Sequence, residues 1–183
     1  MSSTFVSVGT PVALKSDPSG SDSTPALTVR CGDRFVALDQ CSAGVWACAG
    51  QPARGEDLAT TPHQRAALDE LVQNGLMVCF ADDLGQASDA VLDLVPVPLS
   101  IGLGPSTEDP VRVAIADRTG TILVRVGVAD YVIWSHLDGR TSIRYAITRS
   151  AAELRCNPAE LVPRIPALFA ALLTSGAVAL DVG

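Results

Sequence analysis

The sequence predicts an α+β fold made of two similar units, each a small antiparallel β-hairpin sheet packed on three short helices. Two observations carry this prediction. A β-hairpin pattern precedes each of the two tryptophans, Trp46 and Trp134. After each tryptophan come a break, a weak helix, a capped amphipathic helix and an apolar segment that begins behind a glycine. The same order of signals therefore occurs twice, which indicates an internal repeat.

The length and composition fit this organisation. The chain has 183 residues, enough for one ordinary domain or two small ones with modest cores. Hydrophobic residues make up 48% and charged residues 18%, which is typical of a chain that folds. We expect four segments: an N-terminal edge strand and flexible loop in residues 1–26, a degenerate first unit in 27–82, a Pro-rich linker in 83–110 and the second unit in 111–183.

Strand signals come in pairs separated by turn residues. The first hairpin turns at Gly32-Asp33, and the second turns through residues 117–120. In the second hairpin, Val113 and Ile115 alternate with smaller or polar residues, as expected for half-buried strands. The predicted extended segments are residues 5–14, 27–31, 34–38, 95–101, 111–116 and 121–126.

The third helix of each unit has the clearest boundaries. The sequences TPHQ at residues 61–64 and NPAE at 157–160 each combine an N-cap, a proline in the first turn and a capping-box residue. Gly75 and Gly176 stand where a left-handed C-cap is needed. The predicted helices are residues 42–49, 62–74, 130–137, 141–154 and 158–175, the last bent by Pro163 and Pro166, with a short helix at 90–94. The second helix of the first unit is expected to be truncated, because residues 51–55 contain Gly and Pro.

The sequence disfavours several kinds of chemistry. Five cysteines are an odd number without C-x-x-C spacing, so we expect buried thiols rather than disulfides or a zinc site. The two histidines, His63 and His136, have no clustered ligands, and no nucleophile stands beside a base. Asp138 close to His136 is explained as part of an Asp-Gly turn. We therefore predict no catalytic residues, no metal and no cofactor.

Trp46 and Trp134 are predicted to be core residues, because each falls on the apolar face of a short helix. The sequence begins without a basic, apolar signal segment, and its longest apolar run, residues 166–180, is short and interrupted. This pattern predicts a cytoplasmic protein that does not contact the membrane.

A hairpin packed on three short helices is a winged-helix arrangement, and the second unit resembles the PqqD-like family, also called the RiPP recognition element. The resemblance is carried by the strand ILVRV at residues 122–126, the helix and its exit ADYVIWSHLDG at 129–139, and RTSI at 140–143. Leu168, Leu172 and the exit Ser175-Gly176-Ala177 complete it, so that it covers about residues 111–182. The first unit departs from the pattern, because it lacks Asp-Gly after its first helix and has a shorter second helix.

This resemblance implies a non-catalytic adaptor that binds the leader segment of a ribosomally synthesised precursor peptide and presents it to a separate maturation enzyme. The leader would add a strand to the hairpin sheet beside the third helix, a binding mode known as β-augmentation. The implied site residues are Ile122, Val124 and Val126 on the receiving strand, Leu168, Phe169 and Leu172 in the groove, and Arg125, Arg140 and Arg144 as donors to an acidic peptide.

Two alternatives remain open at this stage: a winged-helix regulator that binds DNA, and a tandem winged-helix scaffold in a larger assembly. The formal net charge of −7 disfavours nucleic acid as a partner. The charge is uneven, however. Residues 1–110 hold five basic and fourteen acidic residues, whereas residues 111–183 hold eight arginines and six acidic residues. The only net positive part is thus the second unit, which favours acidic partners there.

Overall fold

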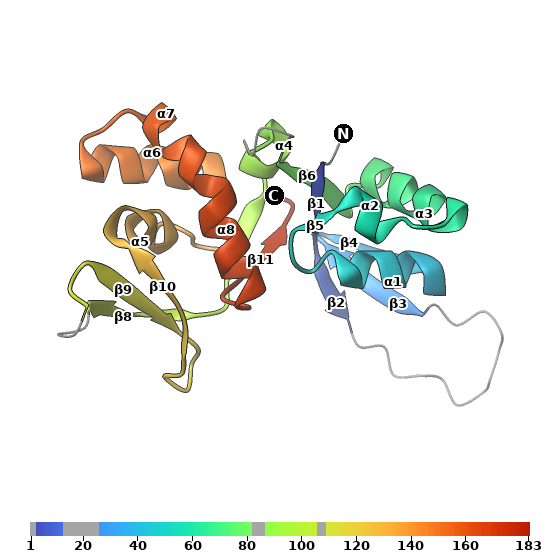
Figure 1. The fold of residues 1–183 in the computed structure, drawn as a ribbon, viewed down its shortest axis with the longest axis horizontal. Coiled ribbons are helices and arrows are strands. Elements are labelled where there is room, and N and C mark those ends of the chain that lie inside the picture. The colour runs from blue at the N-terminus through green and yellow to red at the C-terminus, as the bar shows by residue number, and fades with distance from the viewer. Residues whose placement is uncertain (1–2, 13–25, 82–86, 106–108) are drawn as a thin grey trace.

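The computed structural model describes residues 3–12, 26–81, 87–105 and 109–183, and it has the predicted α+β fold. Two halves lie side by side, and the C-terminal strand runs between them (Figure 1). The flexible loop expected at residues 16–25 lies outside the described residues. Buried hydrophobic residues form one contiguous cluster that extends through both halves, while the sheets remain separate.

The first half contains six strands and three helices within the described residues. Its elements are β1 (Thr4–Ser7), β2 (Thr10–Val12), β3 (Leu27–Cys31), β4 (Arg34–Leu38), α1 (Gln40–Cys48), β5 (Ala53–Arg54), α2 (Gly55–Leu58), α3 (Pro62–Gln73) and β6 (Met77–Ala81). The predicted hairpin β3–β4 has the expected boundaries, and α2 is the truncated second helix.

The second half begins with the short helix α4 and ends with the last strand. Its elements are α4 (Asp89–Leu92), β7 (Val95–Pro98), β8 (Ile101–Pro105), β9 (Arg112–Ala116), β10 (Ile122–Gly127), α5 (Val128–Ser135), α6 (Ile143–Leu154), α7 (Pro158–Leu161), the 3-10 turn η1 (Val162–Arg164), α8 (Ile165–Thr174) and β11 (Val178–Asp181).

The strand pairing shows that the repeat is larger than the sequence indicated. The sheet orders β2-β3-β4 and β8-β9-β10 match, and the pair β1–β6 matches the pair β7–β11. Equivalent backbone bonds follow this correspondence: Val8 N–H donates to the Leu76 carbonyl at 2.9 Å, and Leu99 N–H donates to the Ala177 carbonyl at 2.9 Å. Each repeat thus includes two strands that precede its hairpin.

These extra strands change the expected roles of two segments. The sequence predicts one edge strand at residues 5–14, of which 13 and 14 lie outside the described residues. The described part belongs to two strands, β1 and β2, and β1 lies in the middle of the sheet β5-β1-β6. Residues 95–105, within the expected linker, form β7 and β8, which pair with β11 and β9. Local sequence could not show these pairings, because their partners are distant in the chain.

The helix boundaries follow the capping signals. Both capping boxes form, Thr61 with Gln64 and Asn157 with Glu160. Gly75 has φ +71° and Gly176 has φ +70°, the left-handed conformation that glycine adopts without strain.

The helix predicted over residues 158–175 is not a single bent helix. It is divided into α7, η1 and α8, and the division contains Pro163 and Pro166. Proline has no amide hydrogen to donate and crowds the preceding turn, so a run with two prolines loses regular helical bonding.

Both tryptophans are buried, as predicted, at 7% and 8% exposed. Trp46 Nε1 donates to the Val8 carbonyl at 3.1 Å, and Trp134 stacks on Tyr131 with ring centroids 5.4 Å apart.

The cysteines differ in how far they are buried. Cys31 is buried, and this burial raises the pKa of its thiol, but Cys48 is exposed and the prediction of uniformly buried thiols is wrong for it.

A buried carboxylate connects the two halves. Asp181 on β11 accepts a hydrogen bond from the Gly32 amide in the β3–β4 turn at 2.8 Å, and Arg30 lies 3.9 Å away. Gly9 N–H also donates to the Leu180 carbonyl at 2.9 Å. The last strand of the chain therefore bonds to the first half as well as to β7.

Replacing Asp181 by Ala should destabilise the protein by about 1–3 kcal/mol, because the partly buried Gly32 amide would lose its acceptor. Urea unfolding monitored by tryptophan fluorescence measures the change. Asp69→Ala on the exposed surface of α3 is the control and should change the free energy of unfolding by less than about 0.5 kcal/mol. Equal effects of the two substitutions would contradict this role of Asp181.

Candidate functional site

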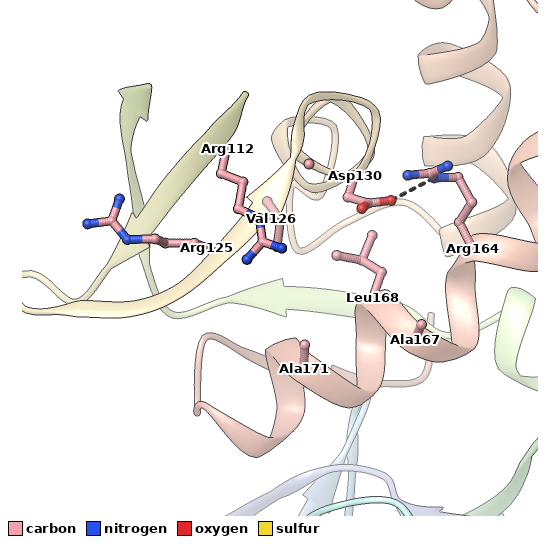
Figure 2. A pocket seen from close by; sticks show the side chains of 9 residues that line it. Arg112, Arg125, Val126, Asp130, Arg164, Ala167, Leu168 and Ala171 are labelled. Atoms are coloured by element: carbon pink, nitrogen blue, oxygen red, sulfur yellow. Dashed lines mark hydrogen bonds and ion pairs between the residues drawn. The ribbon is translucent and has the colours of Figure 1, made fainter. Parts of the chain in front are cut away.

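A groove of about 540 Å³ lies between β10 and α8. Strand residues form one wall, the start of α5 closes one end, and small residues of α8 form the other wall (Figure 2). The lining residues are Arg112, Arg125, Val126, Gly127, Asp130, Arg164, Ala167, Leu168 and Ala171.

The strand wall is the edge of a sheet. In the order β10-β9-β8, β10 is the outer strand, and β9 is its one strand partner among the described residues. Pairing is regular from Val124 to Gly127, after a register shift between Ile122 and Val124. An antiparallel edge strand directs every second pair of N–H and C=O groups away from its neighbour. The β10 edge can thus accept another extended segment.

The helix wall is lined by small side chains on one face of α8. Ala167 and Ala171 are four residues apart, so they lie on the same face, with Leu168 beside them. Leu168 and Ala171 point from α8 toward the strand (Figure 2). Phe169 and Leu172 lie farther round the helix, Leu172 one turn after Leu168, and both are fully buried in the core. The helix is therefore held firmly while its groove face leaves room beside β10.

Three arginines give the groove its charge, and they differ in how they are paired. Arg164 Nε donates to Asp130 at 2.7 Å, and this hydrogen bond raises the pKa of Arg164 above its usual value. Arg125 Nη1 is buried with no hydrogen-bond partner in the described part of the chain. Arg112 and Arg125 also have no carboxylate within ion-pair distance among the residues described. Arg112 and Arg125 thus bring positive charge to the groove that no carboxylate of the described residues neutralises.

The structure brings together only some of the predicted site residues. Arg125, Val126 and Leu168 line the groove. Val124 is half-buried and Ile122 is 44% exposed, on the same strand but outside the lining. The predicted strand and part of the predicted helix therefore meet at one surface.

Phe169 and Leu172 do not line the groove. Both are fully buried and belong to the hydrophobic core, so the expectation for these two residues is corrected. Leu168 and Phe169 are adjacent and both apolar, so the sequence does not show which of them faces the core and which faces the groove.

Arg144 has internal partners and lies away from the groove. Its Nε donates to Asp93 at 2.9 Å and its Nη2 donates to Asp89 at 3.1 Å, so it ties α6 to α4. These hydrogen bonds, with Asp93 the larger contributor, raise the pKa of Arg144. Arg144 therefore does not line this groove, and its contact with a peptide stays a prediction.

Arg140 also lies outside the groove, in the turn after α5. Asp138 accepts hydrogen bonds from the Arg140 and Thr141 amides at 2.8 Å each, and these bonds lower the pKa of its carboxyl group. This arrangement agrees with the predicted Asp-Gly turn. His136 contacts Glu153 at 3.0 Å instead of Asp138.

The sequence interpretation missed Arg112 and Asp130 as groove residues. Arg112 on β9 pairs with Gly127, the last residue of β10. The pairing register of the hairpin is therefore the signal that places Arg112 beside the end of β10. Asp130 becomes significant only through its bond to Arg164, 34 residues later in the chain.

No three His, Cys, Asp or Glu side chains among the described residues are grouped so as to hold a metal ion. In the same part of the chain, no helix has the length and apolar character to cross a bilayer. No protein-family model matches the sequence, and no curated protein is significantly similar to it.

Arg144→Ala should loosen α4 without changing the groove, because its two carboxylate partners are both on or next to α4. Hydrogen exchange should become faster at the amides of α4 and stay unchanged in β10 and α8. Arg149→Ala, an exposed arginine on the same helix, is the control and should leave exchange in α4 unaltered. Faster exchange in β10 after Arg144→Ala would show that the residue acts on the groove after all.

Proposed function

We propose that this chain is a non-catalytic adaptor that binds the leader segment of a ribosomally synthesised precursor peptide and presents it to a partner maturation enzyme. The observation that carries the proposal is the edge of β10 beside a groove lined by Arg112 and Arg125, two arginines without a carboxylate partner in the part of the chain that the structure describes. The resemblance of residues 111–182 to the PqqD-like family supports the same function.

In this proposal the leader adds an antiparallel or parallel strand to β10. Main-chain hydrogen bonds provide most of the affinity, and alternate side chains enter the groove toward Ala167, Leu168 and Ala171. The small alanines accommodate bulky apolar side chains of the leader. Val126 and Leu168, both nearly buried, form the floor against which such side chains lose contact with water.

Acidic side chains of the leader then meet Arg112 and Arg125. A guanidinium offers two parallel N–H donors to a carboxylate, and the partial burial of Arg125 strengthens that bond relative to a fully exposed pair. The net charge of −7 works against long acidic or nucleic-acid ligands elsewhere on the surface. Recognition therefore combines a short acidic motif with an apolar one.

Arg125→Ala should weaken binding of an acidic peptide about 10-fold or more, because a partly buried charge-assisted hydrogen bond is lost. The probe is the best binder selected from a random dodecapeptide library on the wild-type protein, labelled for fluorescence anisotropy. Arg149→Ala is the matched control and should bind as the wild type does.

The salt dependence and a DNA competitor complete this test. Raising the ionic strength should weaken peptide binding to the wild-type protein more than peptide binding to Arg125→Ala. The reason is that salt screens the charge of Arg125, which the variant lacks. Selection of no Arg125-dependent peptide would refute the proposal, and tight binding of a 30-base-pair duplex would favour a DNA-binding regulator.

Ala167→Trp should abolish peptide binding while the protein stays folded, since Ala167 is exposed and lines the groove. The indole would occupy the space between α8 and β10. Ala152→Trp on the exposed surface of α6 is the control and should retain affinity. Thermal unfolding of both variants reports stability, and unchanged affinity of a folded Ala167→Trp variant would exclude this groove as the site.

A further inference from the structure

The repeat creates a second groove in the first half, between β4 and α3. It has a volume of about 200 Å³. Like β10, β4 is the last strand of a three-stranded sheet, and within residues 3–12, 26–81, 87–105 and 109–183 it pairs with β3 alone. The groove is lined by Val36, Ala37, Leu38, Asp39, Ser42, Glu70, Leu71, Asn74 and Leu76.

Several lining residues of the two grooves occupy corresponding positions in the repeat. Asp39 is the N-cap of α1 and Gly127 is the N-cap of α5, so Leu38 corresponds to Val126. At the other wall, the Leu71 carbonyl accepts a bond from the Leu76 amide, as the Leu172 carbonyl does from Ala177. Glu70 therefore corresponds to Ala171.

The charge of the two grooves is opposite. Counting from the same anchors, Arg125 corresponds to Ala37 and Arg164 to His63. Arg112 corresponds to Ala26, because Leu27 pairs with Leu38 as Val113 pairs with Val126. In place of arginines, the β4 groove has the carboxylates of Asp39 and Glu70.

Both carboxylates are positioned to meet a ligand. Glu70 is exposed on α3, and none of the ion pairs within the described chain involves it. Asp39 Oδ1 accepts a hydrogen bond from the Ser42 amide at 2.7 Å, and this bond lowers the pKa of the carboxyl group and favours its ionised form. A cationic side chain that entered between β4 and α3 would find one carboxylate on each wall.

The outer face of β4 carries a large apolar side chain in solvent. Phe35 is 66% exposed, the most exposed aromatic side chain among the described residues. A segment added to β4 would place alternate side chains on the Phe35 side and in the groove. The strand edge, the groove and the exposed ring therefore suit the same extended occupant.

We propose that the β4 groove binds an extended, lysine- or arginine-bearing segment of a partner protein, which adds a strand to β4 and places its cation between Asp39 and Glu70. Charge complementarity selects this occupant, since the same groove geometry in the second half carries the opposite sign. The β4 site is separate from the β10 site, so the two grooves hold segments of opposite charge at the same time.

The test selects dodecapeptides from a random display library on the full chain and repeats the selection on Glu70→Lys and Asp69→Lys. Both variants make the same charge change on α3, but Asp69 lines a different depression, with Thr60 and Pro62. We expect a lysine- or arginine-containing class that Glu70→Lys loses and Asp69→Lys retains. Its affinity should fall at least about 10-fold in Glu70→Lys.

Amide chemical shifts of the wild-type protein then locate the binding. The basic peptide should shift resonances of β4 and α3 and leave those of β10 and α8 unchanged. The absence of a Glu70-dependent basic class, or shifts confined to β10, would overturn the proposal. The same selection also yields the acidic peptides that depend on Arg125. It therefore distinguishes a failure of the proposal for the β4 groove from a failure of the proposal for the β10 groove.

Discussion

The closing strand pair of each repeat is the constraint on which the rest of the structure depends. The first strand of each repeat pairs with the strand that follows the third helix, as β1 does with β6 and β7 with β11. This pairing fixes where the third helix ends and therefore how far it stands from the edge of the hairpin. A left-handed glycine, Gly75 or Gly176, turns the chain from the helix into that strand. The width of each groove is thus set by backbone bonding outside it.

The arginines of the second half fall into two groups by their neighbours. Arg144 and Arg164 each have carboxylate partners in the chain, so part of the positive charge is used for packing α4 and α5. Arg112 and Arg125 are held beside β10 without such partners in the described residues. The electrostatic character of a surface therefore follows from which charges remain unpaired, more than from the net charge of the segment.

Local signals in the sequence predicted the parts that depend on neighbouring residues. The hairpin at Gly32, the capping boxes and the glycine ends of the third helices all involve residues within a few positions of each other. The sequence was less informative where distant segments meet. The β7–β11 pair, the partners of Arg144 and the inward orientation of Phe169 and Leu172 depend on contacts across about 50 to 80 residues or on the direction of a helix face. Sequence patterns predicted the strand that forms one wall of the candidate groove. How the arginines of the groove come together depends on the pairing register of β9 and β10, which those patterns did not give.

The β7–β11 pair also determines which part of the chain can fold on its own. A fragment that began at residue 111 would keep β9, β10 and all the helices from α5 onward, but it would leave β11 without its partner and β9 with an open side. Two unprotected strand edges favour association between copies. The smallest autonomous form of the second half therefore starts at or before Val95, where β7 begins.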